Sequence, residues 1–132
     1  MPIVFFDPSN DTLKGISNSV FQHIDMVPSI LSYLNYPKNY IAFGKNIFKK
    51  NEDLSFAINY HNGYQLITRN TFIKYNEESE RVIAVFDLIR DPLLKNNILN
   101  TSDSIKLLKN KLTGFIQQYN NRMINNQLII EN

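Results

Sequence analysis

The sequence predicts an α/β fold in which a short buried strand and a helix precede a four-stranded antiparallel meander covered by a long C-terminal helix. Near the N-terminus, a continuous apolar run is followed by apolar residues at helical spacing. After residue 51 the apolar period changes to two, and a regular helical stripe returns near the C-terminus. We therefore expect an N-terminal part, residues 1–50, and a sheet-and-helix subdomain, residues 51–132.

The composition fits one globular domain and excludes several classes of protein. The chain has 132 residues, 43% of them hydrophobic, and a net charge of +2, which suits a folded core and argues against a nucleic-acid partner. Lys45, Lys49 and Lys50 are the nearest approach to a basic cluster, and we interpret them as part of a solvated loop. Cysteine is absent, which excludes disulfides and thiolate metal sites. No apolar run approaches the ~18 residues of a membrane span, and the N-terminus does not read as a signal peptide.

The N-terminal part is predicted to contain one strand and one helix. Pro2–Phe6 is a continuous apolar run that ends at Asp7-Pro8, as expected of a strand buried on both faces in a parallel sheet. A helical apolar face follows, formed by Ile24, Val27, Ile30, Leu31 and Leu34.

The start and end of this helix are predicted from its polar and proline residues. Asp25 stands where an N-cap belongs, and Pro28 would lie in the first turn, where its missing N–H costs no hydrogen bond. The helix should end at Asn35-Tyr36, because Pro37 disfavours helical geometry in the residue before it.

Four strands are predicted from alternating apolar residues. Phe56–Tyr60 and Tyr64–Arg69 flank Asn62-Gly63, the strongest short hairpin signal, because both positions tolerate positive φ. Thr71–Tyr75 and Arg81–Leu88 follow, separated by the polar turn NEESE.

The long C-terminal helix is predicted to cover one face of this sheet. Its apolar stripe consists of Ile105, Leu108, Leu112, Phe115, Ile116, Tyr119 and Met123. Thr101 or Ser102 can cap its start. Gly114 lies mid-helix, where glycine costs roughly 1 kcal/mol against alanine, and a close approach to the sheet would explain it.

Candidate catalytic residues are few. His23 could act as a base oriented by Asp25, but no motif places a nucleophile beside it, and a capping role explains Asp25 fully. His61 adjoins the hairpin turn and has no partners spaced for a metal. Asp7, Asp11 and Asp25 could form a carboxylate cluster, although Asp7 and Asp11 read more simply as turn residues. We assign no catalytic, cofactor-binding or metal-binding residue in this chain.

The order of three sequence stretches resembles a known family. Pro2–Pro8 (PIVFFDP), Ile24–Leu31 (IDMVPSIL) and Ala42–Phe48 (AFGKNIF) are similar to the later region of sulfatase-like enzymes of the alkaline phosphatase superfamily. The nearest branch is the bacterial lipoteichoic acid synthase and phosphoglycerol transferase type. Ser29 stands where the family usually has threonine. The hairpin FAINYHNGYQLI and the phrase DPLLKNNIL also resemble the C-terminal subdomain of these enzymes, so the resemblance spans about residues 1–100.

The resemblance implies a C-terminal fragment of a larger metal-dependent enzyme that hydrolyses or transfers a sulfate or phosphate ester. In the family, the nucleophile and the metal ligands, including an Asp-His pair, lie upstream of the region matched here, so no functional residue carries over. A divalent metal is implied for the parent enzyme and none for this chain. The parent would be membrane-anchored with an extracytoplasmic catalytic domain, and the fragment itself would be soluble and inactive.

Two hypotheses therefore remain open. In the first, the chain is an enzyme fragment whose natural partner is the missing catalytic core. The strand at residues 3–6 and the helix at residues 26–35 would then leave apolar surface exposed, and the isolated chain would self-associate. In the second, the chain is a stand-alone, non-catalytic binding or interaction module built on the same sheet and helix. Neither hypothesis includes a nucleic-acid partner or direct membrane contact.

Overall fold

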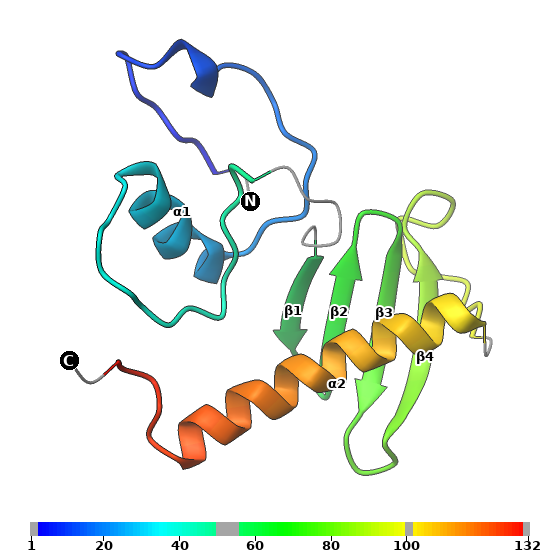
Figure 1. The fold of residues 1–132 in the computed structure, drawn as a ribbon. Coiled ribbons are helices and arrows are strands. Elements are labelled where there is room, and N and C mark those ends of the chain that lie inside the picture. Colours follow the sequence, from blue (N-terminus) through cyan, green and yellow to red (C-terminus); the bar gives the residue numbers. More distant parts are fainter. Residues whose placement is uncertain (1–2, 50–55, 100–101, 131–132) are drawn as a thin grey trace.

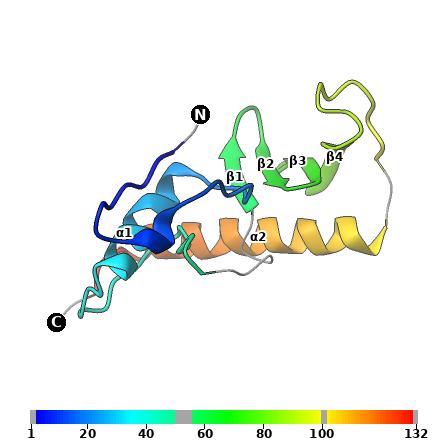
Figure 2. The same cartoon turned by 90° about the horizontal axis from the view of Figure 1, so that it is seen from above.

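Four antiparallel strands and one long helix form the larger part of the fold. The computed structural model describes residues 3–49, 56–99 and 102–130. Strands β1 (Phe56–Tyr60), β2 (Tyr64–Thr68), β3 (Thr71–Asn76) and β4 (Arg81–Asp87) lie side by side in chain order (Figure 1). Helix α2 (Asp103–Ile124) runs across one face of this sheet (Figure 2). The predicted meander and its covering helix are thus confirmed.

The tight turns follow the sequence signals. Asn62 and Gly63 have φ angles of 49° and 110°, so both adopt the positive φ expected of the Asn-Gly hairpin. A Cβ on Gly63 would also lie 2.7 Å from the carbonyl oxygen of Tyr75, so no larger residue fits this turn. In the β3–β4 turn, the Asn76 carboxamide oxygen accepts hydrogen bonds from the backbone N–H and the hydroxyl of Ser79, both at 2.8 Å.

The hydrophobic core lies between the sheet and α2. Leu66, Ile73 and Val85 face one another across three neighbouring strands, and Ile105 and Leu112 reach them from the helix. All five are buried. Alternate strand residues point to the same face, which is why the period-two pattern supplies one side of this core.

Helix α2 starts where the sequence places it. Ser102 occupies the N-cap position, and its carbonyl oxygen accepts hydrogen bonds from the N–H groups of Ile105 and Lys106. The explanation offered for Gly114 is wrong, because this glycine is exposed and a Cβ built on it would meet nothing within 4 Å.

In the described residues of the N-terminal part, 3–49, the structure has short helical elements and no strand. The 3₁₀ turns η1 (Asp11–Leu13) and η2 (His23–Asp25) precede helix α1 (Met26–Tyr33). The predicted helix is therefore present. The positive φ of Asn35, 51°, ends the helical geometry shortly before Pro37.

The predicted buried strand at Pro2–Phe6 is wrong for the residues the structure describes. Residues 3–6 are assigned to no strand, and the side chains of Val4 and Phe6 are 84% and 85% exposed; Pro2 lies outside the described residues. A strand buried on both faces needs neighbouring strands and covering elements, whereas the one sheet of the described residues contains only β1 to β4.

The connector between α1 and β1 joins the two parts of the molecule. Phe43 packs against Phe115 and Tyr119 of α2, with ring centroids 5.9 and 5.0 Å apart. Helix α2 continues past β1 toward the N-terminal part (Figure 1). Its first half therefore covers the sheet, and its second half contacts the connector. Among the described residues, no helix combines the length and the apolar character needed to cross a membrane.

Candidate functional site

Asp25 is the centre of a buried polar network beside the sheet. Its Oδ1 accepts a hydrogen bond from the Lys45 backbone N–H at 2.9 Å. Its Oδ2 accepts one from the Lys45 ammonium at 2.9 Å and one from the Gln22 N–H at 3.0 Å. The side chain of Asp25 is fully buried and that of Lys45 is 12% exposed. The carboxylate thus satisfies its charge and both of its oxygens within the protein.

The prediction that Asp25 caps helix α1 is wrong about the groups that its side chain bonds. Asp25 immediately precedes α1, but its side chain makes no capping hydrogen bond to that helix. The 3₁₀ turn η2 begins the helical path earlier, so the backbone of Asp25 is already helical, with φ −79° and ψ −16°. Its carboxylate turns back to the N–H of Gln22, the residue before η2. It still satisfies an amide at the start of the helical segment, as a capping-box acid does.

The interpretation of the basic cluster as solvated is wrong for Lys45. Besides pairing with Asp25, its ammonium donates a hydrogen bond to the carbonyl of Phe56 and lies 4.9 Å from the centroid of the Phe56 ring. Lys49 is exposed as expected, and Lys50 lies outside the described residues. The sequence signal that points to Lys45 is the Gly44-Lys45 pair within the stretch 42–48.

Gly44 explains how Lys45 reaches a buried carboxylate. A Cβ on Gly44 would lie 1.9 Å from the carbonyl oxygen of Ile24, so only glycine permits this approach of two backbone segments. Ser29 fixes the same contact from α1. Its hydroxyl donates to the Asp25 carbonyl at 2.6 Å and accepts from the Ile47 N–H at 3.1 Å. Ser29 is fully buried, like Asp25.

The two histidines do not join this network. His23 in η2 and His61 in the β1–β2 turn are both exposed. Because the Asp25 carboxylate is directed to Gln22 and Lys45, it does not orient His23 as a general base. The catalytic-pair reading of His23 and Asp25 is therefore not supported by the geometry.

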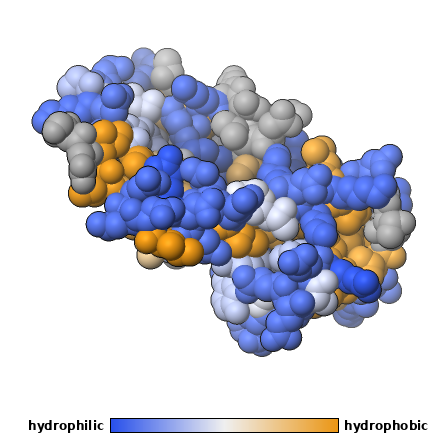
Figure 3. All heavy atoms as spheres, turned by 60° about the horizontal axis from the view of Figure 1, so that its bottom comes forward, coloured by the Kyte–Doolittle hydropathy of each residue, from blue (hydrophilic) through white to orange (hydrophobic). Residues whose placement is uncertain are grey.

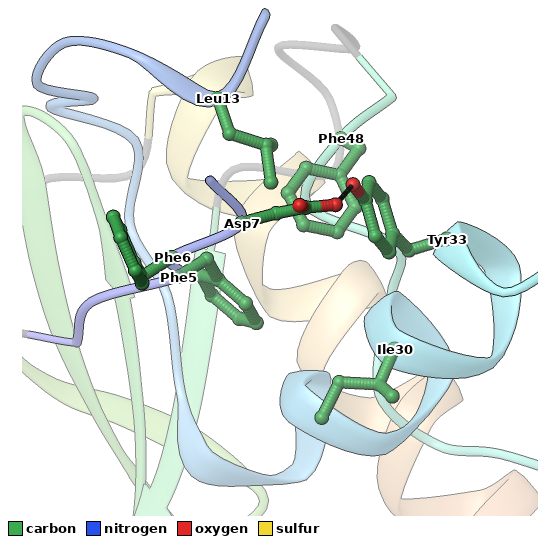
Figure 4. Close-up of a pocket in the computed structure, with 7 residues that line it drawn as sticks. All are labelled: Phe5, Phe6, Asp7, Leu13, Ile30, Tyr33 and Phe48. Atoms are coloured by element: carbon green, nitrogen blue, oxygen red, sulfur yellow. Dashed lines mark hydrogen bonds between the residues drawn. The ribbon is translucent and has the colours of Figure 1, made fainter. Parts of the chain in front are cut away.

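Asp7 belongs to a separate small cavity of about 100 Å³ (Figure 4). Its Oδ1 accepts hydrogen bonds from the N–H and hydroxyl of Ser9 at 2.8 and 2.6 Å, and its Oδ2 accepts one from the Tyr33 hydroxyl. These bonds, those from Ser9 first, lower the pKa of Asp7, and the bond to Asp7 raises the pKa of Tyr33. The rest of the cavity wall is apolar and consists of Phe5, Phe6, Leu13, Ile30 and Phe48.

The three aspartates have different partners, so they form no carboxylate cluster. Asp11 pairs with Lys14 on the surface, Asp7 bonds Tyr33, and Asp25 pairs with Lys45. Among the described residues, no three histidine, aspartate or glutamate side chains gather in a way that could hold a metal ion. The donors that this part of the chain presents therefore do not fit a divalent-metal centre.

The site is thus a structural junction that ties α1, the connector and β1 together. Compared with known proteins, the chain matches no family model, no curated sequence and no solved structure.

Proposed function

We propose that this chain is the C-terminal part of a sulfatase-like, metal-dependent enzyme of the alkaline phosphatase superfamily, of the lipoteichoic acid synthase and phosphoglycerol transferase type. Its role in that enzyme is structural: it supplies the sheet-and-helix subdomain and a helix that packs on the catalytic core. The parent hydrolyses or transfers a sulfate or phosphate ester.

The main support is the contact between the two stretches that carry the resemblance. IDMVPSIL supplies Asp25 and Ser29, and AFGKNIF supplies Gly44, Lys45 and Ile47. The Asp25 carboxylate accepts a hydrogen bond from the Lys45 ammonium at 2.9 Å, and the Ser29 hydroxyl accepts one from the Ile47 backbone N–H at 3.1 Å. These contacts give the residues that carry the resemblance a role in this fold, which supports the proposal.

Exposed apolar side chains in the N-terminal part are the second support. The side chains that we define as the N-terminal apolar surface are between 42% and 85% exposed. They are Val4, Phe6, Ile24, Val27, Ile30 and Leu34. Hydrophobic areas interrupt the hydrophilic surface of the molecule (Figure 3). Apolar faces that a monomer leaves in water commonly mark contact with another part of a protein, here the catalytic core.

The chemistry of the proposed parent lies outside this chain. A divalent metal would activate the nucleophile and stabilise the charge of the ester oxygens. The described residues here do not fit that role, because Asp25 is neutralised by Lys45 and Asp7 is bonded to Ser9 and Tyr33. We propose further that the parent is membrane-anchored, with its catalytic domain outside the cytoplasm.

Sequencing the genomic DNA upstream of the Met1 codon tests this proposal. We expect an open reading frame continuous with this chain that encodes membrane helices and an Asp-His metal motif. An in-frame stop codon followed by a ribosome-binding site directly before Met1 would contradict it and favour a stand-alone binding module.

Activity of the isolated chain gives an independent test. The purified 132-residue protein should cleave neither aryl sulfates nor aryl phosphates with zinc, manganese or magnesium. Metal-dependent turnover that is lost in His23→Ala would overturn the fragment proposal and restore His23 as a base.

Self-association tests the N-terminal apolar surface. In sedimentation velocity, a Val27→Glu/Leu34→Lys variant should associate less than the wild type, because Val27 on α1 and Leu34 at its C-cap are both more than 60% exposed. Leu107→Lys is the matched control, since Leu107 is 66% exposed on α2. Equal effects of the two variants would show that the surface has no special role in association.

A further inference from the structure

Strand β1 is an edge strand, and two side chains close its outer side. Among the strands of the described residues, β1 pairs only with β2. The N–H of Ile58 donates to the Gln22 carboxamide oxygen at 2.9 Å, and the carbonyl of Phe56 accepts from the Lys45 ammonium. Residues two apart on a strand direct their N–H and C=O groups to the same side. Gln22 and Lys45 therefore occupy consecutive bonding sites on the side away from β2.

The opposite edge of the sheet is closed in the same way. On β4, the Asn97 carboxamide accepts from the Val85 N–H at 3.0 Å and donates to the Ile83 carbonyl at 3.4 Å. The N–H of Ile98 donates to the Val85 carbonyl at 2.9 Å. At both edges, a carboxamide from a distant loop takes a place that a further strand would take. Edge strands expose bonding groups that recruit other chains, and proteins commonly block them.

One buried carboxylate aligns both groups on the β1 edge. Asp25 bonds the backbone N–H of Gln22 and both nitrogens of Lys45, and its position is fixed by the Gly44 contact with Ile24. We call Gln22, Asp25 and Lys45 the edge clamp. Asp25 bonds Gln22 and Lys45, which in turn bond β1, so it acts on the strand through these two residues.

We propose that Asp25 is a positioning residue of the edge clamp, and that the clamp prevents β1 from pairing with β1 of a second copy of this chain. Two copies of β1 that pair antiparallel about Ile58 are related by a two-fold axis. The free N–H and C=O groups on the outer side of one copy therefore match those of the other. The strand sequence FAINY carries no charge that would oppose this pairing and is rich in strand-forming residues.

Hydrogen exchange at the Ile58 amide tests the clamp directly. Gln22→Ala removes the acceptor and leaves the ion pair intact, so exchange at Ile58 should rise roughly 2- to 10-fold, as expected for one lost hydrogen bond. Asp25→Asn should raise the same rate although neither Gln22 nor Lys45 is changed. The amides of Ala57 and Asn59, which alternate to the β2 side, are internal references and should change little.

Pairing between copies is tested in a variant that opens the edge, Gln22→Ala/Asp25→Asn/Lys45→Met, which leaves no uncompensated buried charge. The chain has no cysteine, so an added Asn59→Cys takes a single spin label. We expect sedimentation velocity to show more self-association than in the wild type, and the spin spectrum to show short-range dipolar broadening. Lys111→Met is the matched control, since Lys111 lies 5.1 Å from the same Phe56 ring, and it should show neither change.

The proposal fails in either of two ways. If exchange at Ile58 is unchanged in Gln22→Ala, the bond to Gln22 does not protect the edge. If the opened variant associates no more than the wild type, or associates without dipolar broadening at residue 59, β1 is not the pairing surface. Adding Val27→Glu/Leu34→Lys to the opened variant distinguishes the two surfaces, because this change should reverse association only if it occurs through the N-terminal apolar surface.

Discussion

The sheet-and-helix unit and the N-terminal part use their apolar residues differently. In the unit, Leu66, Ile73 and Leu112 are completely buried between the sheet and α2. In the N-terminal part, Val27 of α1 and Leu34 at its C-cap are 61% and 66% exposed, and the fully buried side chains of the described residues are the polar Asp25 and Ser29. Both regions show clear apolar periodicity in sequence, but among the described residues only the sheet-and-helix unit buries apolar side chains completely.

The difference shows what holds each region in place. Burial of apolar area stabilises the sheet-and-helix unit, at roughly 25 cal/mol per Å². The N-terminal part is attached by the edge clamp, by the close approach of Gly44 to Ile24, and by aromatic contacts such as that of Phe43 with Tyr119. Polar networks of this kind depend on every partner, so the two regions should respond to different substitutions.

The largest effect is expected from breaking the buried ion pair. Lys45→Met leaves the Asp25 carboxylate buried without its cation and should destabilise the N-terminal part by about 3–5 kcal/mol. Urea unfolding followed by NMR signals of residues 22–49 measures this. Lys49→Met, an exposed control, should change stability by less than about 0.5 kcal/mol. Equal unfolding midpoints for the two variants would show that the pair does not hold this region.

Truncating the core tests the sheet-and-helix unit. Leu112→Ala should lower the free energy of unfolding by roughly 2–5 kcal/mol, because it leaves a cavity against Leu66 and Ile73. Phe115→Ala should cost less than Leu112→Ala, since Phe115 is only partly buried and contacts Phe43. Leu107→Ala is the exposed control. A Leu112→Ala variant as stable as Leu107→Ala would place the covering face of α2 elsewhere.

Two glycines should respond in opposite directions to the same change. Gly44→Ala forces a methyl group against the Ile24 carbonyl and should destabilise by about 1–3 kcal/mol. Gly114→Ala meets nothing within 4 Å on an exposed helix position and should stabilise by about 1 kcal/mol. Thermal unfolding of both variants decides this, and effects of the same sign would contradict the geometry at one of the two sites.

The smallest effect concerns Asp7, at the exposed end of the N-terminal part. Its pKa in the folded protein is lowered, chiefly by Ser9 and then by Tyr33. The stabilisation from its carboxylate is therefore present above the ordinary aspartate pKa and is lost as the pH falls through the lowered value. In an NMR titration of the carboxyl carbon, Ser9→Ala should raise the pKa of Asp7 more than Tyr33→Phe does. The reverse order would contradict the assigned bonds.

The sequence predicted the sheet-and-helix unit nearly residue by residue. Alternation placed all four strands, Asn62-Gly63 placed the first hairpin, and the stripe from Ile105 to Met123 placed α2. These signals are local, since each depends on residues a few positions apart and on the side-chain period of one element.

In the N-terminal part, the sequence determined the presence of helix α1, while the tertiary structure decided the roles of its residues. The run at Pro2–Phe6 predicted a buried strand, but its residues 3–6 form none, because burial on both faces requires neighbouring strands. The sequence pattern predicted a helix cap at Asp25 and a solvated cation at Lys45. Their pairing joins residues twenty positions apart and requires a glycine at position 44 to let two backbone segments meet. Periodicity records which face of an element is apolar, and it contains no information on which distant group that element will meet.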